Sequence, residues 1–126
     1  MLLRENRLRR DRDFRRVYSR GRRWALPSVI LYSYRNEASS VRFGLAVGKK
    51  IGKAVRRNRV RRCMRECCRR LLPTIADGWD IILVARPPIR DLELEDVLAA
   101  VAMLLERSPC LKDRSVSPFQ TPTLPM

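Results

Sequence analysis

The sequence predicts a single, strongly basic domain in which helices and β-strands are mixed. Its 126 residues suffice for one domain with its own core, and a hydrophobic fraction of 45% excludes a wholly disordered chain. Segments with the apolar period of a helix alternate with short strand-like runs. Lys and Arg outnumber Asp and Glu by 28 to 13, which gives a net charge of +15.

The first expected helix covers residues 11–20. Either Asp11 or Asp13 can cap it, and Gly21 can end it. Three of its positions repeat at i, i+3 and i+4, which predicts one apolar face: Phe14, Val17 and Tyr18.

Strands are expected next, a brief one at 22–25 and longer ones at 28–34 and 41–48, the last two separated by the turn-like sequence RNEASS. Strand periodicity places three side chains of the second strand on one face: Ile30, Tyr32 and Tyr34. One face of the third strand has only small or basic residues, so it is nearly flat and could admit a close helix or a ligand: Arg42, Gly44, Ala46 and Gly48.

The second and longest helix is expected from about residue 52 to 72, ended by Pro73. The run 79–86 is apolar on both faces, which predicts a central strand covered on both sides. Asp91 then caps a last helix with an apolar stripe: Leu94, Val97, Leu98, Val101, Leu104 and Leu105. We expect a domain over residues 1–107 and a disordered, proline-rich tail over 108–126.

Most of the positive charge lies in two blocks, with ten Arg in residues 4–23 and eleven Lys or Arg in residues 49–70. On a helix at 100° per residue, the second block has an apolar arc: Val60, Cys63, Met64, Cys67 and Leu71. A second arc is polar: Asn58, Arg61, Arg62, Arg65 and Arg69, flanked by Arg57 and Arg59. Unpaired Arg side chains one turn apart repel one another, so this face indicates an anionic partner rather than solvent alone.

Nucleic acid is the leading partner class, and an anionic membrane surface is the main alternative. No segment approaches the length of an apolar membrane span, and no signal-peptide core is present. The aromatic residues near the basic blocks, Phe14, Tyr18, Tyr32 and Tyr34, have two open interpretations. They either pack in the core or form a stacking platform for unpaired bases.

Residues for protein-based catalysis are scarce. The chain has no histidine, which excludes an imidazole acid–base pair. Asp77 with Asp80 is better explained by a turn than by a metal-nuclease site, and we expect no catalytic and no metal-binding residues. Three of the four cysteines crowd one helix in a spacing that suits neither zinc nor a disulfide framework, so a cytoplasmic location is expected.

Four ordered blocks carry a resemblance to the protein component of bacterial ribonuclease P, over about residues 7–107. They are DFRRVYSRG at 13–21, GLAVGKK at 44–50, KKIGKAVRRNRVRRCMRE at 49–66 with its Arg-Asn-Arg motif, and WDIILVARP at 79–87. Two positions depart from the family pattern, because Tyr18 stands where Phe is common and Gly48 where Ser is usual. The tail after Pro109 has no counterpart.

The resemblance implies the noncatalytic protein subunit of an endoribonuclease that removes the 5′ leader of precursor tRNA. Its partners would be the catalytic RNA subunit, which performs the Mg²⁺-dependent hydrolysis, and precursor tRNA. No cofactor bound by the protein alone, no membrane and no obligate protein partner are implied. Composition by itself leaves open another RNA-binding structural protein, such as a ribosomal protein.

The resemblance also implies a fold and two sets of site residues. The fold is a two-layer α/β sandwich of order αβββαβα, with a four-stranded mixed sheet and a left-handed βαβ crossover, similar to a ribosomal-protein domain. The single-stranded leader would bind in a cleft lined by Phe14, Tyr18, Ile30, Tyr32, Arg57, Arg61, Arg62 and Arg65. The RNA subunit would contact Lys49, Lys50, Lys53, Arg56, Asn58, Arg59 and Arg69.

Overall fold

The structure is a computed structural model and describes residues 4–112. Its centre is a four-stranded sheet with the strand order β1-β2-β4-β3. The chain forms 3₁₀ helix η1 (Arg4–Asn6), α1 (Asp11–Arg20), β1 (Arg22–Ala25), β2 (Val29–Arg35), β3 (Arg42–Ala46), η2 (Lys49–Ile51), α2 (Ala54–Leu71), η3 (Leu72–Thr74), β4 (Trp79–Ala85), η4 (Pro87–Asp91) and α3 (Leu94–Arg107). The predicted order αβββαβα is confirmed, with helix and strand ends shifted by up to three residues.

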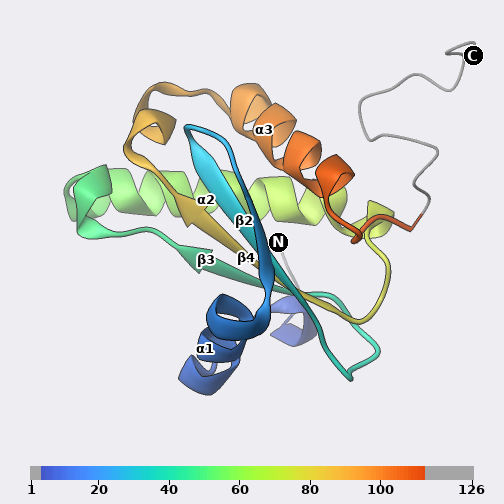
Figure 1. Cartoon of the computed structure of the whole chain (residues 1–126). Helices are drawn as coiled ribbons and strands as arrows, with labels where there is room; N and C mark the ends of the chain where they lie inside the picture. The colour runs from blue at the N-terminus through green and yellow to red at the C-terminus, as the bar shows by residue number, and fades with distance from the viewer. Residues whose placement is uncertain (1–3, 113–126) are drawn as a thin grey trace, which may run out of the picture.

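Two helices cover one face of the sheet and the third crosses the other face. Figure 1 shows α2 and α3 packed on one side and α1 on the opposite side. The larger core lies between the sheet and the α2–α3 layer, and Leu31, Ile81, Leu83 and Leu104 are fully buried there. A smaller core under α1 contains Leu8, Val17 and Ile82. No helix within residues 4–112 is long and apolar enough to cross a membrane.

Strand β4 lies at the centre, as its continuous apolar sequence predicted. It pairs antiparallel with β2 and parallel with β3, which makes the sheet mixed. Ile81 and Leu83 face the α2–α3 layer, while Ile82 faces α1. The register places Tyr32, Ile82 and Gly44 in one row across β2, β4 and β3. This row lies beneath α1.

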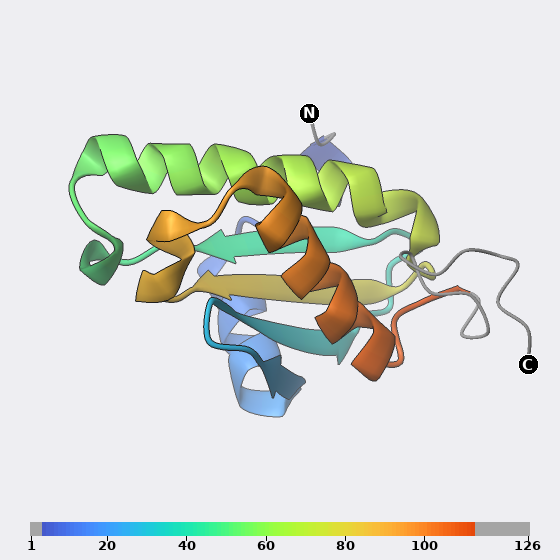
Figure 2. The same cartoon turned by 90° about the horizontal axis from the view of Figure 1, so that it is seen from above.

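The connection from β3 through α2 to β4 is left-handed. Figure 2 views the sheet from the face that carries α2 and α3, and β3 and β4 point in the same direction there. With both strands turned to point upward, β4 lies to the left of β3. Crossovers of this kind are nearly always right-handed. The family resemblance predicted the observed hand, and the general rule did not.

Two predicted helix caps are wrong. Neither Asp11 nor Asp13 precedes α1, since both lie in its first turn and Arg10 occupies the capping position without a side-chain bond. The Asp13 side chain instead turns toward the sheet. Asp91 ends the 3₁₀ helix η4, and the residue before α3 is Glu93, whose backbone N–H donates to Asp96 at 3.1 Å.

The end of α1 at Gly21 is confirmed, and its cause is a close approach. A Cβ at this position would lie 2.4 Å from the carbonyl oxygen of Val17 and 2.5 Å from that of Ser33. Glycine therefore lets the chain leave the helix and begin β1 directly against β2.

The folded part of the chain continues past the expected boundary at residue 107. Ser108 and Cys110 are fully buried, and the Cys110 carbonyl accepts a hydrogen bond from the Ala76 amide at 2.8 Å. The Lys112 amide donates to the Thr74 carbonyl at 2.9 Å. Residues 108–112 thus pack on the turn after α2. The remainder of the expected tail, 113–126, lies outside the described residues.

Candidate nucleic-acid interface

An aromatic platform lies between α1 and the sheet; we define it as Phe14, Tyr18, Ile30 and Tyr32. Phe14 and Tyr18 are one helical turn apart on α1, with ring centroids separated by 6.5 Å. The Tyr18 and Tyr32 rings meet edge to face at 4.8 Å. Ile30 lies two residues before Tyr32 on the same half-buried face of β2. The structure therefore gathers the predicted aromatic residues from a helix and a strand.

The sequence left two interpretations open for these aromatic residues, core packing and base stacking, and each applies to a different residue. Phe14 packs on the small core under α1, against the backbone of Gly44 on β3. Tyr18 is 40% exposed, so part of its ring faces solvent. Partial burial, with a smaller contribution from Tyr32, raises the pKa of Tyr18 above its usual value, which keeps its hydroxyl protonated. Phe14 thus fixes the position of α1 while Tyr18 offers an exposed ring.

The basic residues of α2 form an arginine face, which we define as Arg57, Arg61, Arg62 and Arg65. Arg57 and Arg61 are half-buried at the side of the helix, and Arg62 and Arg65 are exposed. Arg61 donates to the side chain of Asn58 at 3.1 Å. Within residues 4–112, none of the four makes an ion pair with an acid. The Arg57 Nε is buried without a hydrogen-bond partner in that part of the chain. These guanidinium groups therefore remain available to an anion.

The buried side of α2 differs from the predicted arc in one residue. Cys68, which was expected outside the arc, is buried, and Cys63 is only half-buried. The buried side is therefore rotated toward Arg57 and Arg61, because α2 packs on β3 as well as on α3. All four cysteines are free thiols.

The platform and the arginine face lie on opposite sides of the sheet. Figure 1 shows α1 below the sheet and α2 above it. Edge strand β3 separates them, and its residues on the platform side include Gly44 and Ala46. The Phe14 ring covers Gly44, whereas Ala46 is half-buried and Gly48 is exposed, so a polymer could pass from the platform to α2 around the C-terminal end of β3. The predicted leader residues thus form two surfaces around one edge strand.

Most of the predicted RNA-subunit residues gather where η2 leads into α2. Lys49 and Lys50 lie on η2, Lys53 precedes α2, and all three are exposed. Arg56 and Arg59 line a pocket of about 190 Å³ between α2 and α3. Asn58 is exposed on the other side of α2, where it accepts the bond from Arg61.

Arg69 lies apart from this group, about 20 Å along the helix from Arg56 at 1.5 Å per residue. It donates to Glu66 from Nε at 2.9 Å, and Arg70 donates to the same carboxylate at 2.9 Å. These bonds lower the pKa of Glu66 to about 2. Arg69 is therefore partly neutralised within the protein.

Sequence reasoning missed a third basic region, which we call the arginine basin. It is an open hollow of about 750 Å³ beside α1, lined by nine arginines and three acids from the N-terminal segment, α1, the end of β2 and the start of β3. The signal was present as the ten Arg of residues 4–23, but their arrangement depends on how α1 crosses the sheet.

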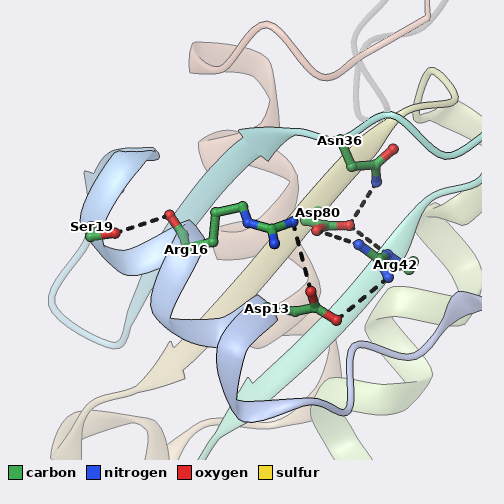
Figure 3. Close-up of polar contacts among 6 residues, drawn as sticks. All are labelled: Asp13, Arg16, Ser19, Asn36, Arg42 and Asp80. Atoms are coloured by element: carbon green, nitrogen blue, oxygen red, sulfur yellow. Dashed lines mark hydrogen bonds and ion pairs between the residues drawn. The ribbon is translucent and has the colours of Figure 1, made fainter.

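A buried ion-pair network forms the floor of this basin (Figure 3). Asp80 is 1% exposed and accepts two hydrogen bonds from Arg42, both at 2.8 Å, and one from Asn36 at 2.6 Å. The hydrogen bonding to Asp80 raises the pKa of Arg42. Asp13 lies 3.7 Å from Arg42 and 3.8 Å from Arg16. The network ties α1 to β3 and β4.

The network also explains Asp80, which the sequence analysis assigned to a turn with Asp77. Asp80 is instead the second residue of β4, and its charge is matched by Arg42. Among the described residues, no group of three or more His, Cys, Asp or Glu side chains is placed to hold a metal ion.

Comparison with known proteins gives a consistent family match. The family described as Ribonuclease P matches residues 2–108. The Ribonuclease P protein component of Herpetosiphon aurantiacus is 40% identical over 111 residues, covering 88% of this chain and 90% of that protein. That of Clostridioides difficile is 36% identical over 102 residues, covering 80% and 90%.

Solved structures match in fold as well. The RNase P protein of Staphylococcus aureus superposes with a TM-score of 0.78 at 30% identity, covering 85% of this chain and 98% of that one. The RNase P protein of Thermotoga maritima gives 0.74 at 30% identity, covering 81% and 96%. The match in sequence and in fold therefore extends over most of each chain.

Proposed function

This chain belongs to the ribonuclease P family of protein components, and from that premise we propose that it binds the catalytic RNA subunit and the single-stranded 5′ leader of precursor tRNA to promote 5′-end maturation. The observation that carries the proposal is the pair of surfaces around edge strand β3: the aromatic platform with an exposed Tyr18 ring, and the arginine face of α2, whose four guanidinium groups make no ion pair with an acid in the described residues. Such a pairing of rings and cations suits an unpaired RNA strand.

The platform supports the leader assignment because only an unpaired strand offers its base faces. Stacking of a base on an aromatic side chain contributes about 1–3 kcal/mol and does not depend strongly on sequence. Tyr18 and Tyr32 present such rings, and the open space at Gly48, after the end of β3, leaves room for the strand to continue toward α2. The bases of a tRNA acceptor stem are paired and would gain little here.

The arginine face and the exposed lysines around η2 support binding to phosphates. Each guanidinium or ammonium group that contacts a phosphate releases condensed counterions, so affinity should fall steeply with salt. Residues 49–70 contain eleven basic residues and one acid, Glu66, which forms ion pairs with Arg69 and Arg70. The proposed contacts to the RNA subunit are Lys49, Lys50, Lys53, Arg56, Asn58, Arg59 and Arg69, and those to the leader include Arg57, Arg61, Arg62 and Arg65.

The proposal places the hydrolysis of the phosphodiester bond on the RNA subunit, with Mg²⁺ as its metal ion. A chain without histidine offers no imidazole for acid–base catalysis. The role of the protein is then to increase the affinity for substrate and to reduce repulsion between two polyanions. The proposal includes the cytoplasmic location that the cysteine spacing predicts.

The test is reconstitution with a bacterial ribonuclease P RNA at a Mg²⁺ concentration too low for the RNA to act alone. Release of the 5′ leader should require both RNA and protein, and protein alone should release none. RNA binding without rescue of cleavage would contradict the proposal and leave a basic RNA-binding domain of another kind. Cleavage by protein alone would contradict the assignment of the chemistry to RNA.

A further inference from the structure

The arginine basin lies on the opposite side of α1 from the aromatic platform. Phe14 and Tyr18 point to one side of the helix, while Arg12, Arg16 and Arg20 line the basin. At 100° per residue, Arg16 lies about 200° from Phe14, which is the far side of α1. The two surfaces are therefore separate, and a ligand in one leaves the other free.

The basin has a fixed floor and a charged rim. Arg42 and Arg16 are held at the floor by Asp80 and Asp13. On the rim, Arg9, Arg12 and Arg20 make no ion pair with any acid in residues 4–112. With nine arginines against three acids, the basin keeps a large excess of positive charge. Such a concentration of guanidinium groups is matched by several phosphates rather than by one small anion.

The basin lacks a stacking platform for bases. Tyr34 is its one aromatic lining residue, and that ring packs on the small core under α1. A strand bound here would therefore be held by its phosphates and not by its bases. Base-paired RNA is recognised in this way, because its backbone is exposed while its bases are stacked inside. The platform on the other side of α1 has the complementary preference for unpaired bases.

We propose that the arginine basin binds the sugar–phosphate backbone of a base-paired segment of the RNA subunit. This inference rests on the proposed function, which supplies the RNA subunit as partner. The N-terminal segment lines the basin and runs along the outer edge of β3, where the Leu8 amide donates to the Phe43 carbonyl at 2.7 Å. Helix α2 packs on the other face of β3. One folded RNA can therefore contact the basin and the basic residues of α2 around this edge.

The first experiment compares two RNAs with equal numbers of phosphates, a hairpin and an unpaired strand, for binding to the protein alone. The test variant is Arg9→Gln/Arg12→Gln, because both side chains are exposed and without acidic partners. Arg15→Gln is the matched control on the same helix outside the basin, and Arg107→Gln is a distant control on α3.

The test variant should bind the hairpin about ten-fold more weakly, and its slope of log affinity against log salt should fall by roughly 1 for each lost contact. Each control should change hairpin affinity less than three-fold, because it removes about one unit of positive charge from the protein without removing a contact in the basin. An equal loss for test and control variants would overturn the proposal. A loss confined to the unpaired strand would overturn the preference for base-paired RNA.

The second experiment uses the reconstituted holoenzyme. The test variant should require about ten-fold more protein for half-maximal cleavage, while the affinity of the assembled complex for precursor tRNA stays unchanged. If the test variant needs no more protein for half-maximal cleavage but its holoenzyme binds precursor tRNA more weakly, the assignment of the basin to the RNA subunit is overturned. If wild-type protein fails to rescue cleavage but the hairpin result holds, the proposed function fails and the basin remains an RNA-backbone site. If wild-type protein rescues cleavage but all variants bind the hairpin equally well, the proposed function stands and the proposal for the basin is overturned.

Discussion

The Phe14 ring lies directly against the backbone of Gly44. A Cβ added to Gly44 would lie 2.6 Å from Cζ and 2.8 Å from Cε2 of that ring. Helix α1 can therefore approach the sheet this closely only because β3 has no side chain there. Since Tyr18 follows Phe14 on the same side of α1, this contact also sets the height of the aromatic platform above the sheet.

We predict that Gly44→Ala destabilises the protein by about 1–3 kcal/mol, because the ring and α1 must move to accommodate the methyl group. Urea unfolding followed by circular dichroism measures this change. Gly48→Ala is the matched control, since nothing lies within 4 Å of a Cβ at that position. Equal losses for the two variants would contradict the close-packing argument.

We predict that Arg42→Met destabilises the protein by about 3–5 kcal/mol, because it leaves the buried Asp80 carboxylate without its cation. The double variant Arg42→Met/Asp80→Asn should recover much of this loss, since the unpaired charge is gone. Arg16→Met, which removes a 3.8 Å contact of an exposed guanidinium, should cost less than about 1 kcal/mol. The urea midpoints of the three variants test this order of stabilities. A loss of stability for Arg42→Met no larger than that for Arg16→Met would contradict the prediction.

We predict that Glu66→Gln increases RNA affinity and steepens its salt dependence, because Arg69 is released for phosphate contacts while Arg70 keeps its bond to Glu95. The folded-state pKa of Glu66 is lowered to about 2, so its ion pairs are present above the ordinary carboxyl range and are lost as pH falls through about 2. The difference from wild type should therefore persist at about pH 4, where ordinary carboxyl groups are half protonated. Asp91→Asn is the exposed control, and an equal gain from it would show a general charge effect.

We predict that Cys63 is the first cysteine to be alkylated. Its hydrogen bond with Cys67 lowers the pKa of the Cys63 thiol, whereas that bond and burial raise the pKa of Cys67, and burial raises that of Cys68. Cys63 also lines the pocket between α2 and α3. Mass spectrometry after brief iodoacetamide treatment should find the label on Cys63, with the others labelled only after unfolding. Early labelling of Cys68 would contradict the packing of α2.

Local patterns predicted most of the fold, and tertiary contacts decided the remainder. The continuous apolar run of β4 and the aromatic face of β2 were both evident in the sequence and are confirmed. The caps at Asp13 and Asp91 were wrong because local propensity cannot foresee that Asp13 finds Arg42 and Arg16, or that a 3₁₀ helix intervenes before α3.

The candidate site was predictable as residue types but not as surfaces. Periodicity placed Phe14 with Tyr18 and grouped the arginines of α2. It could not show that α1 and α2 lie on opposite faces, which separates the two sets of leader residues. The arginine basin was missed for a related reason, because the seven arginines that line it from residues 4–20 meet Arg35 and Arg42 only when α1 crosses the sheet.

The most direct test of the account compares the affinity of the reconstituted holoenzyme for precursor and mature tRNA, with Tyr18→Ala and Tyr18→Phe as the paired variants. Tyr18→Ala, like Arg61→Ala or Arg65→Ala, should weaken precursor binding by about ten-fold or more and leave mature tRNA binding nearly unchanged, since only the precursor has a leader to stack. Tyr18→Phe keeps the ring and should bind precursor as wild type does. Equal losses for precursor and mature tRNA would contradict the assignment of the platform to the leader.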